Sequence, residues 1–339
     1  MDIKKLEEWY LANRRDLPFR RTKDPYQIWV SEIMLQQTQV DTVLPFFNRF
    51  ITKYPILDVL ASAKEETLQK DIEGLGYYRR FRNMHLAAKQ IVSSHPSQPS
   101  VFPSTYENLI QLPGIGKYTA GAIMSIAFNK PYSALDGNVI RVLSRFLEDT
   151  TDMRREINKK RLNQINQSFV EKATPNVYTQ AMMELGATIC RPKQPKCDVC
   201  PLKDHCLSFR HGTQDSIPVL SKLKTKETFY FITLILKDDM HYYLRKRDEN
   251  LLKGMYEWPQ FPMESILSVL LELEAQNINI EITSEPKMVQ HVFTHQIWHM
   301  EVYEAYLISG KHPTWVNVPK ENFHLLPMAT AHRKIKKIK

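Results

Sequence analysis

Two carboxylic acids are the side chains of this sequence best placed to do chemistry. Asp136 lies in SALDGNVIRV, directly before a glycine and the predicted start of a helix. An Asp at that position can cap the helix, because its side chain accepts hydrogen bonds from the unpaired N–H groups of the first turn. The same carboxylate can instead face a substrate. This stretch alone leaves both interpretations open.

Glu32 is the second carboxylic acid, in the segment WVSEIMLQQT of a helix predicted over residues 25–43. Asp24 offers an N-cap to this helix and Pro25 a favourable first position. Helical spacing puts Glu32 on a face shared with apolar neighbours such as Trp29 and Leu35. Loss of water around a carboxyl raises its pKa, which makes Glu32 a candidate general acid near neutral pH. The alternative is a glutamate that points to solvent.

All four cysteines of the chain, Cys190, Cys197, Cys200 and Cys206, form one C-x6-C-x2-C-x5-C group. Such thiolates suit Zn2+ or an iron–sulfur cluster, since both take soft sulfur ligands. Zinc ribbons usually pair two C-x2-C turns, whereas this group contains one. The spacing therefore favours a [4Fe-4S] cluster over zinc, and both over cysteines without a ligand.

Two glycines, Gly114 and Gly116, lie in LPGIG between helices predicted over residues 105–111 and 117–128. Bare N–H groups at a helix N-terminus can bind a phosphate. A short turn between two helices also needs glycine for steric reasons alone. The glycines do not decide between these explanations.

The elements that position these residues divide the chain into a helical part, residues 1–210, a polar linker, 211–228, and a mixed α/β domain, 229–339. The helical part should contain further helices over residues 57–71, 79–92, 139–146, 159–171 and 176–188, and a Pro/Ser loop over residues 95–104. The α/β domain should contain strands over residues 229–236, 241–247 and 298–307 and a helix over residues 263–276. The last seven residues, RKIKKIK, are expected to form a frayed basic tail near phosphates, or simply a solubilising end.

The charge balance favours an anionic partner, because 46 Lys and Arg outnumber 37 Asp and Glu. The sequence has no signal peptide and no apolar run of about 18 residues, so we expect an intracellular protein that does not enter a membrane.

Together, LPGIG, an Asp about 20 residues later and the cysteine spacing resemble the helix-hairpin-helix DNA glycosylases of the endonuclease III type. With WVSEIMLQQT, GLGYYRR, LDGNVIRV and QAMMELGATIC added, the chain resembles the MutY-type adenine DNA glycosylases. The resemblance implies an all-α glycosylase domain with a six-helix lobe and an iron–sulfur lobe, whose cluster loop spans residues 190–206. A Nudix-like lesion-recognition domain would follow.

The implied reaction is the hydrolytic removal of adenine mispaired with 8-oxoguanine or guanine in double-stranded DNA, a step of base excision repair. Glu32 would protonate the leaving adenine, and Asp136 would stabilise the cationic sugar or attack it transiently, a division of labour known from glycoside hydrolysis. Tyr118 and Asn138 would support Asp136 and the sugar. The resemblance further implies a monomer in the cytoplasm, associated with the nucleoid if the source is bacterial.

Other residues acquire DNA-binding roles from the resemblance. Arg20 and Gln180 would hydrogen-bond the flipped adenine, while Leu35 and Phe19 would line its pocket. Gln37 and Tyr77 would intercalate beside the lesion, Gly114 and Gly116 would hold the DNA backbone, and Thr294 and His295 of HVFTHQIWHM would read 8-oxoguanine.

Two motifs that are absent limit the activity. Relatives that also cut the strand carry a Schiff-base lysine two residues after the second hairpin glycine, where this sequence has Tyr118, so we expect a monofunctional glycosylase. No R-E-x2-E-E follows Gly254, so we expect no Nudix hydrolase activity. The alternatives are a related glycosylase for thymine mismatches or damaged pyrimidines, and a non-catalytic DNA-binding protein with a zinc cage.

Overall fold

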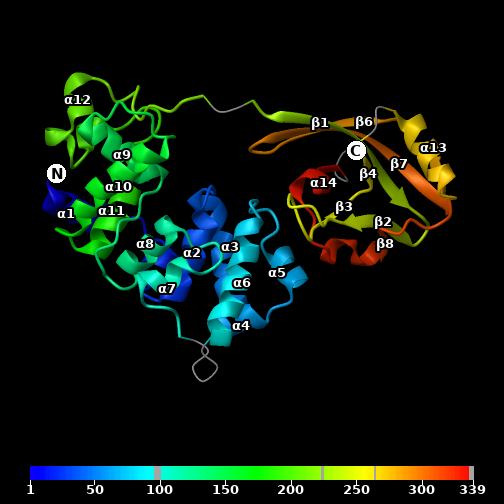
Figure 1. Ribbon diagram of the computed structural model, residues 1–339, viewed down its shortest axis with the longest axis horizontal. Coiled ribbons are helices and arrows are strands. Elements are labelled where there is room, and N and C mark those ends of the chain that lie inside the picture. The colour runs from blue at the N-terminus through cyan, green and yellow to red at the C-terminus, as the bar shows by residue number, and fades with distance from the viewer. Residues whose placement is uncertain (95–100, 223–224, 263–264, 336–339) are drawn as a thin grey trace. The chain divides into compact units, whose positions relative to one another are not determined.

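The computed structural model describes residues 1–94, 101–222, 225–262 and 265–335 (Figure 1). The chain forms two compact units. One consists of Met1–Ser62 with Asn83–Lys222, and the other of Ala63–Arg82 with Leu223–Lys339. No helix among the described residues combines the length and the apolar character needed to cross a bilayer.

The first unit is helical, as predicted. Its helices are α1 (Ile3–Asn13), α2 (Pro25–Leu35), α3 (Val40–Lys53), α4 (Leu57–Ser62), α7 (Tyr106–Ile110), α8 (Lys117–Ile126), α9 (Gly137–Leu147), α10 (Glu156–Val170), α11 (Pro175–Thr188) and α12 (Leu207–His211). Three short 3-10 helices are η1 (Pro18–Arg20), η2 (Cys197–Val199) and η3 (Lys203–His205), and α6 (Arg79–Ser94) runs from the second unit into the first.

Short polar side chains start several of these helices. Asp2, Asp24, Thr105 and Asp136 each accept a hydrogen bond from a backbone N–H of the first turn of α1, α2, α7 and α9, respectively. Such caps satisfy N–H groups that have no partner inside the helix. The sequence thus marks where the helices that carry Glu32 and Asn138 begin.

Two predicted helices are each broken in the structure. The helix predicted over residues 25–43 ends at Leu35, and α3 begins at Val40, because Gln37 adopts a left-handed conformation with φ 58°. The helix predicted over residues 57–71 divides into α4 and α5 (Glu65–Asp71), since Lys64 takes an extended conformation before α5. Neither break coincides with a glycine or a proline, which is why the hydrophobic spacing did not show it.

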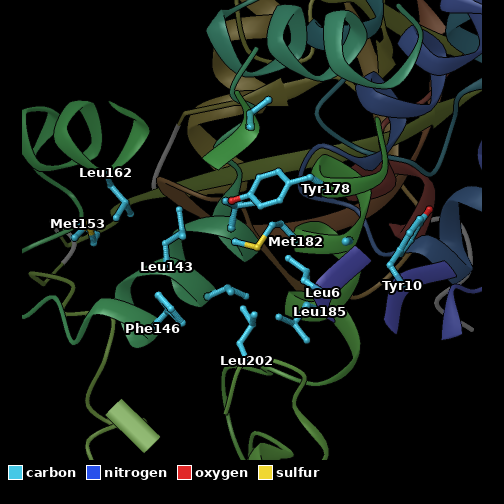
Figure 2. Close-up of a cluster of buried hydrophobic side chains, with 14 residues drawn as sticks. Leu6, Tyr10, Leu143, Phe146, Met153, Leu162, Tyr178, Met182, Leu185 and Leu202 are labelled. Atoms are coloured by element: carbon cyan, nitrogen blue, oxygen red, sulfur yellow. The ribbon is translucent and has the colours of Figure 1, made fainter. Parts of the chain in front are cut away.

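One hydrophobic cluster joins α1, α9, α10 and α11 to residues 190–206, which carry the four cysteines and are called the cysteine segment below (Figure 2). Leu6, Leu143 and Leu185 contribute to it and are fully buried. Leu202, from the cysteine segment itself, is only 4% exposed in the same cluster. Burying a leucine contributes roughly 1.5–3 kcal/mol, so Leu202 helps to hold the cysteine segment against α9 and α11.

The second unit contains α5 and a mixed sheet. Its strands are β1 (Glu227–Lys237), β2 (His241–Lys246), β3 (Tyr256–Glu257), β4 (Gln260–Phe261), β5 (Asn279–Ile282), β6 (Lys287–Val292), β7 (Gln296–Ser309) and β8 (Trp315–Pro319). The main order is β3-β2-β1-β7-β5; β4 pairs with β1, β6 with β7 and β8 with β2, and β1 and β7 run parallel. The predicted mixed α/β domain is confirmed.

Two hydrophobic clusters pack against this sheet. Helix α13 (Ile266–Ala275) places Val269 and Leu273 in one cluster, with Leu234 of β1. The other cluster includes Trp298 of β7 and Ile335 of the C-terminal helix α14 (Thr330–Ile335), which follows the 3-10 helix η4 (Lys320–Leu325). Buried apolar side chains therefore line the sheet in both clusters.

The expectation of a frayed tail over residues 333–339 is wrong for its first three residues. They complete α14, and Ile335 is 1% exposed in the core, because its apolar side chain gains more from packing than the neighbouring charges lose. Residues 336–339 lie outside the described residues, as do residues 95–100 of the predicted loop, 223–224 of the predicted linker and 263–264 of the predicted helix.

Candidate active site

Asp136 caps α9 and also presents a carboxylate that is held in place. Its Oδ1 accepts a hydrogen bond of 2.7 Å from the Val139 backbone N–H, and its Oδ2 accepts one of 2.9 Å from Asn138 Nδ2. Burial raises the pKa of Asp136, and these hydrogen bonds together with the charge of Arg141 act in the opposite direction. The two interpretations left open by the sequence are therefore compatible.

Glu32 is 6% exposed on α2 and accepts a hydrogen bond of 2.6 Å from the Tyr118 hydroxyl of α8. Burial raises the pKa of Glu32 to about 7, with a further increase from the negative charge of Asp136; the Tyr118 hydrogen bond and Arg20 lower it. Burial also raises the pKa of Tyr118 well above its usual value, so the phenol stays a donor. A carboxyl of this kind can hold a proton at neutral pH and release it to a substrate.

Asn138 belongs to a chain of contacts that continues to the first cysteine. Arg141 Nη2 donates to Asn138 Oδ1 at 2.8 Å and to the Gly186 carbonyl at 2.8 Å. Arg141 Nε donates to the Cys190 carbonyl at 2.7 Å. The position of Asp136 is thus tied to α11 and to the cysteine segment through one arginine.

Gly186 was not among the functional residues predicted from the sequence. A Cβ atom at this position would lie 2.5 Å from Asn138 Cβ, closer than real Cβ atoms approach, so only glycine lets α11 pass the start of α9. Glycine inside a helix costs roughly 1 kcal/mol relative to alanine. That cost was the one signal in the sequence that could have drawn attention to ELGAT.

Arg20 and Gln180 lie in one polar cluster that the sequence did not predict as a whole. The Tyr10 hydroxyl donates to Gln180 Oε1 at 3.1 Å, and Arg20 lies over the Tyr10 ring with 5.6 Å between its guanidinium carbon and the ring centroid. Arg20 also pairs with Glu184, a buried residue absent from the sequence prediction. Burial alone would raise the pKa of Glu184, but hydrogen bonds from Arg15 and Arg20 lower it to about 2.

Phe19 and Leu35 differ in their burial. Phe19 is 7% exposed and packs edge-to-face against Phe47 at a centroid distance of 5.4 Å. Leu35 is partly buried at the last position of α2, on the same helix as Glu32.

The structure explains the need for glycine differently at the two hairpin positions, Gly114 and Gly116. Gly114 has φ +78°, and a Cβ there would lie 2.7 Å from Asn83 Cβ, so backbone conformation and space both require glycine. Gly116 is the N-cap of α8 in an extended conformation, and nothing lies within 4 Å of the position its Cβ would take. The steric explanation therefore accounts for Gly114 but not for Gly116, whose bare backbone faces open space beside exposed Lys117.

Gln37 and Tyr77 share an unusual backbone conformation. Both are exposed, and both have positive φ, 58° for Gln37 and 50° for Tyr77. Few residues other than glycine adopt this conformation, and such strain is often found at functional sites.

Within the second unit, Tyr77 lies beside the predicted 8-oxoguanine reader. Thr294 and His295 are exposed in the turn between β6 and β7. Phe293 anchors this turn by packing on Trp298, with 4.8 Å between the ring centroids. The hydroxyls of Tyr77 and Thr294 share a hydrogen bond of 3.1 Å, a contact that was not predicted from the sequence.

The four cysteines line one hollow, together with Arg145, Lys203 and other side chains. Arg145 is 3% exposed, and its Nη1 lies 3.4 Å from Cys190 Sγ. Within the described residues, no three His, Cys, Asp or Glu side chains are positioned to hold a single metal ion. A donor set of four thiols around one hollow, with a buried cation beside it, fits an iron–sulfur cluster.

Comparison with known proteins defines the class. Residues 30–182 match the HhH-GPD superfamily of base excision DNA repair proteins, and residues 231–337 match the NUDIX domain family. A thermostable thymine-DNA glycosylase is similar in structure, with a TM-score of 0.55 and 27% identity over 62% of this chain and 95% of that one. A trapped endonuclease III–DNA intermediate shares the fold, with a TM-score of 0.52, 20% identity and coverage of 62% and 94%. The helical part is a helix-hairpin-helix base excision repair fold.

Sequence relatives narrow the class to one family. The chain is 34% identical to an adenine DNA glycosylase of Buchnera aphidicola subsp. Baizongia pistaciae over 322 residues, 92% of this chain and 85% of the relative. It is 30% identical to an adenine DNA glycosylase of Arabidopsis thaliana over 97% of this chain and 63% of that relative. The chain belongs to the adenine DNA glycosylase family, which confirms the family and the two-part fold predicted from the sequence.

Proposed function

We propose that this protein removes adenine mispaired with 8-oxoguanine or guanine from double-stranded DNA, as a monomeric, monofunctional glycosylase. One observation carries the proposal: Glu32, with a pKa of about 7, lies within electrostatic reach of a second carboxylate, Asp136, that is held by two donors. Two carboxylates whose environments differ in this way are suited to an acid and a charge-stabilising role in glycosidic bond cleavage.

The reaction follows from these positions. Glu32 donates its proton to a ring nitrogen of the flipped adenine, and the bond between the base and the sugar C1′ breaks with its electron pair moving to the base. Asp136 stabilises the positive charge that develops on the sugar until water adds at C1′ and loses a proton. Tyr118 orients Glu32, and Asn138 orients Asp136.

Selection of adenine requires a donor for a ring nitrogen and an acceptor for the amino group. Arg20 supplies the donor, and Gln180 supplies an amide oxygen whose second lone pair remains after the Tyr10 hydrogen bond. Phe19 and Leu35 provide apolar pocket walls. The target base must leave the duplex to reach these groups.

The exposed loops then hold the opened duplex. Gln37 and Tyr77 fill the gap in the stack, while Gly116 and the N-terminus of α8 bind a backbone phosphate beside the turn formed by Gly114. Thr294 and His295 read 8-oxoguanine. Tyr118 stands where a Schiff-base lysine would be needed for strand cleavage, so the product keeps an intact abasic strand.

The four cysteines are proposed to hold a [4Fe-4S] cluster. When bound, it supplies iron–thiolate bonds that fix the segment of residues 190–206, and Arg145 offsets negative charge near Cys190. Access to chromosomal DNA implies a cytoplasmic location, associated with the nucleoid in a bacterium.

The deciding experiment compares duplexes that contain A opposite 8-oxoguanine, A opposite G and T opposite G, each with and without alkali. We expect strand breaks at both adenines only after alkali, and none at T. Asp136→Asn should abolish excision and retain lesion binding, because it removes the charge with little change of volume. Excision of thymine, or wild-type activity of Asp136→Asn, would contradict the proposal. A colourless protein with stoichiometric zinc would exclude the cluster.

A further inference from the structure

We propose that Glu184 is a positioning residue that holds Arg20 ready to donate a hydrogen bond to the base. This inference rests on the proposed function, because it assigns the base-binding role of Arg20 to a fixed geometry. Glu184 itself touches neither the base nor the sugar in this proposal.

The carboxylate of Glu184 forms a clamp for two arginines. It accepts hydrogen bonds from Arg15 Nε at 2.8 Å and Arg15 Nη2 at 2.9 Å, and its Oε2 pairs with Arg20 Nη2 at 2.6 Å. The backbone N–H of Arg15 adds a further contact at 3.2 Å. The Glu184 side chain is 1% exposed. A carboxylate so far from water is stable only with such partners, so the clamp stays charged and closed.

The clamp leaves one part of Arg20 unpaired. The Arg20 side chain is 11% exposed, and its Nη1 is buried without a hydrogen-bond partner. A buried donor without a partner costs free energy, which a ligand acceptor would recover. Arg20 also lies close enough to Glu32 to lower its pKa, so this free donor belongs to the surroundings of the proposed acid.

The guanidinium has little freedom to turn away. Glu184 pairs with one edge of the Arg20 guanidinium, and the guanidinium carbon lies 5.6 Å from the centroid of the Tyr10 ring. Gln180 lies one helical turn before Glu184 on α11, so the proposed acceptor and the clamp share a face of that helix. Preorganised groups of this kind lower the entropic cost of orienting a substrate.

The test separates base binding from DNA binding in the full-length protein. One duplex carries 2′-fluoro-2′-deoxyadenosine opposite 8-oxoguanine, since the fluorine disfavours a cationic sugar and slows cleavage; a second carries a tetrahydrofuran abasic site. We expect Glu184→Gln to weaken binding of the first duplex about 10- to 100-fold, the loss of a charged hydrogen bond, and of the second less than about twofold. Arg20→Met should have the same effect, and the double variant should lose no more.

Asp149→Asn is the matched control, because it also removes a largely buried carboxylate paired with an arginine, Arg161, in the same unit. It should leave the ratio of the two affinities unchanged. Equal weakening of both duplexes by Glu184→Gln, or losses that multiply in the double variant, would overturn the inference.

A second variant covers the case in which Glu184→Gln does not fold. Glu184→Asp keeps the charge but is one methylene shorter and should also lose affinity for the base-bearing duplex; a wild-type ratio for it would overturn the inference. Absence of adenine excision by the wild-type protein would instead refute the proposed function.

Discussion

The raised pKa of Glu32 predicts that the residue destabilises the folded protein at neutral pH and above. Burial raises its pKa from 4.5 to about 7, so between these values the folded state binds more protons than the unfolded state. The free energy of unfolding must then fall as pH rises through that window, and the loss is complete above about pH 7. A shift of this size corresponds to about 3 kcal/mol, at about 1.4 kcal/mol for each pKa unit.

Glu32→Gln removes the titrating group and keeps its shape and its capacity to accept from Tyr118. We expect the unfolding free energy of the variant, relative to that of the wild type, to increase as pH rises. This difference should be up to about 3 kcal/mol larger above pH 7 than near pH 4.5. Urea unfolding followed by far-ultraviolet circular dichroism measures this difference, because helices dominate that signal. Glu107→Gln, at an exposed carboxyl of α7, is the matched control and should show no such trend.

The activity of the wild type should also fall as pH rises, on the alkaline side of the same titration. Single-turnover excision of adenine by the wild type should fall about tenfold for each pH unit above about 7, since only protonated Glu32 can act as the acid. Glu32→Gln should not excise at any pH. A stability difference that does not depend on pH, or excision with no decrease in alkaline solution, would refute the role proposed for Glu32.

Two further predictions concern packing and lesion reading. Gly186→Ala places a Cβ 2.5 Å from Asn138 Cβ, so it should lower the free energy of unfolding by about 1–3 kcal/mol, measured by thermal or urea unfolding, and should slow excision. Gly137→Ala, with open space around its Cβ, should lower the free energy of unfolding less. Equal losses in the two variants would show that α11 can shift. Tyr77→Phe removes the hydroxyl bound to Thr294 and should reduce the preference for A opposite 8-oxoguanine over A opposite G about fivefold, the value of one hydrogen bond. Thr294→Ser retains the hydroxyl and should keep the preference, and an unchanged ratio in Tyr77→Phe would contradict this assignment.

The parts of the structure predicted from sequence are those governed by local rules. The spacing of Glu32 from apolar neighbours offered a buried carboxyl as one of two interpretations, and its exposed fraction is 6%. An Asp before a helix predicted a cap, and Asp136 accepts from the Val139 N–H. Composition after residue 210 predicted a change from helices to a mixed sheet, which the strands from β1 onwards confirm.

The missed features depend on partners far away in the sequence. The role proposed for Glu184 depends on its contacts with Arg15 and Arg20. Both arginines lie far from Glu184 in the sequence, so helical spacing could not predict these contacts. The left-handed conformation of Gln37 interrupts a continuous hydrophobic pattern, and glutamine carries no signal for such a turn. The segment RKIKKIK suggested a charged tail, although Ile335 packs in the core as part of α14, whose Ala331 and His332 are also buried.

The division of labour between the two carboxylates follows from how many donors each one has. Asp136 stands at the start of a helix, where a backbone N–H and Asn138 both donate to it, so its negative charge is supported where a cationic sugar would form. Glu32 stands inside α2, where the backbone N–H groups are used by the helix itself, and it receives one phenol from Tyr118. Burial outweighs the hydrogen-bond donors at both carboxyls and raises the pKa of each. At Glu32 the pKa reaches about 7, which leaves a proton on it near neutral pH, while at Asp136 two hydrogen bonds and the charge of Arg141 act against the rise. Helix position thus supports the acid role proposed for Glu32 and the charge-stabilising role proposed for Asp136.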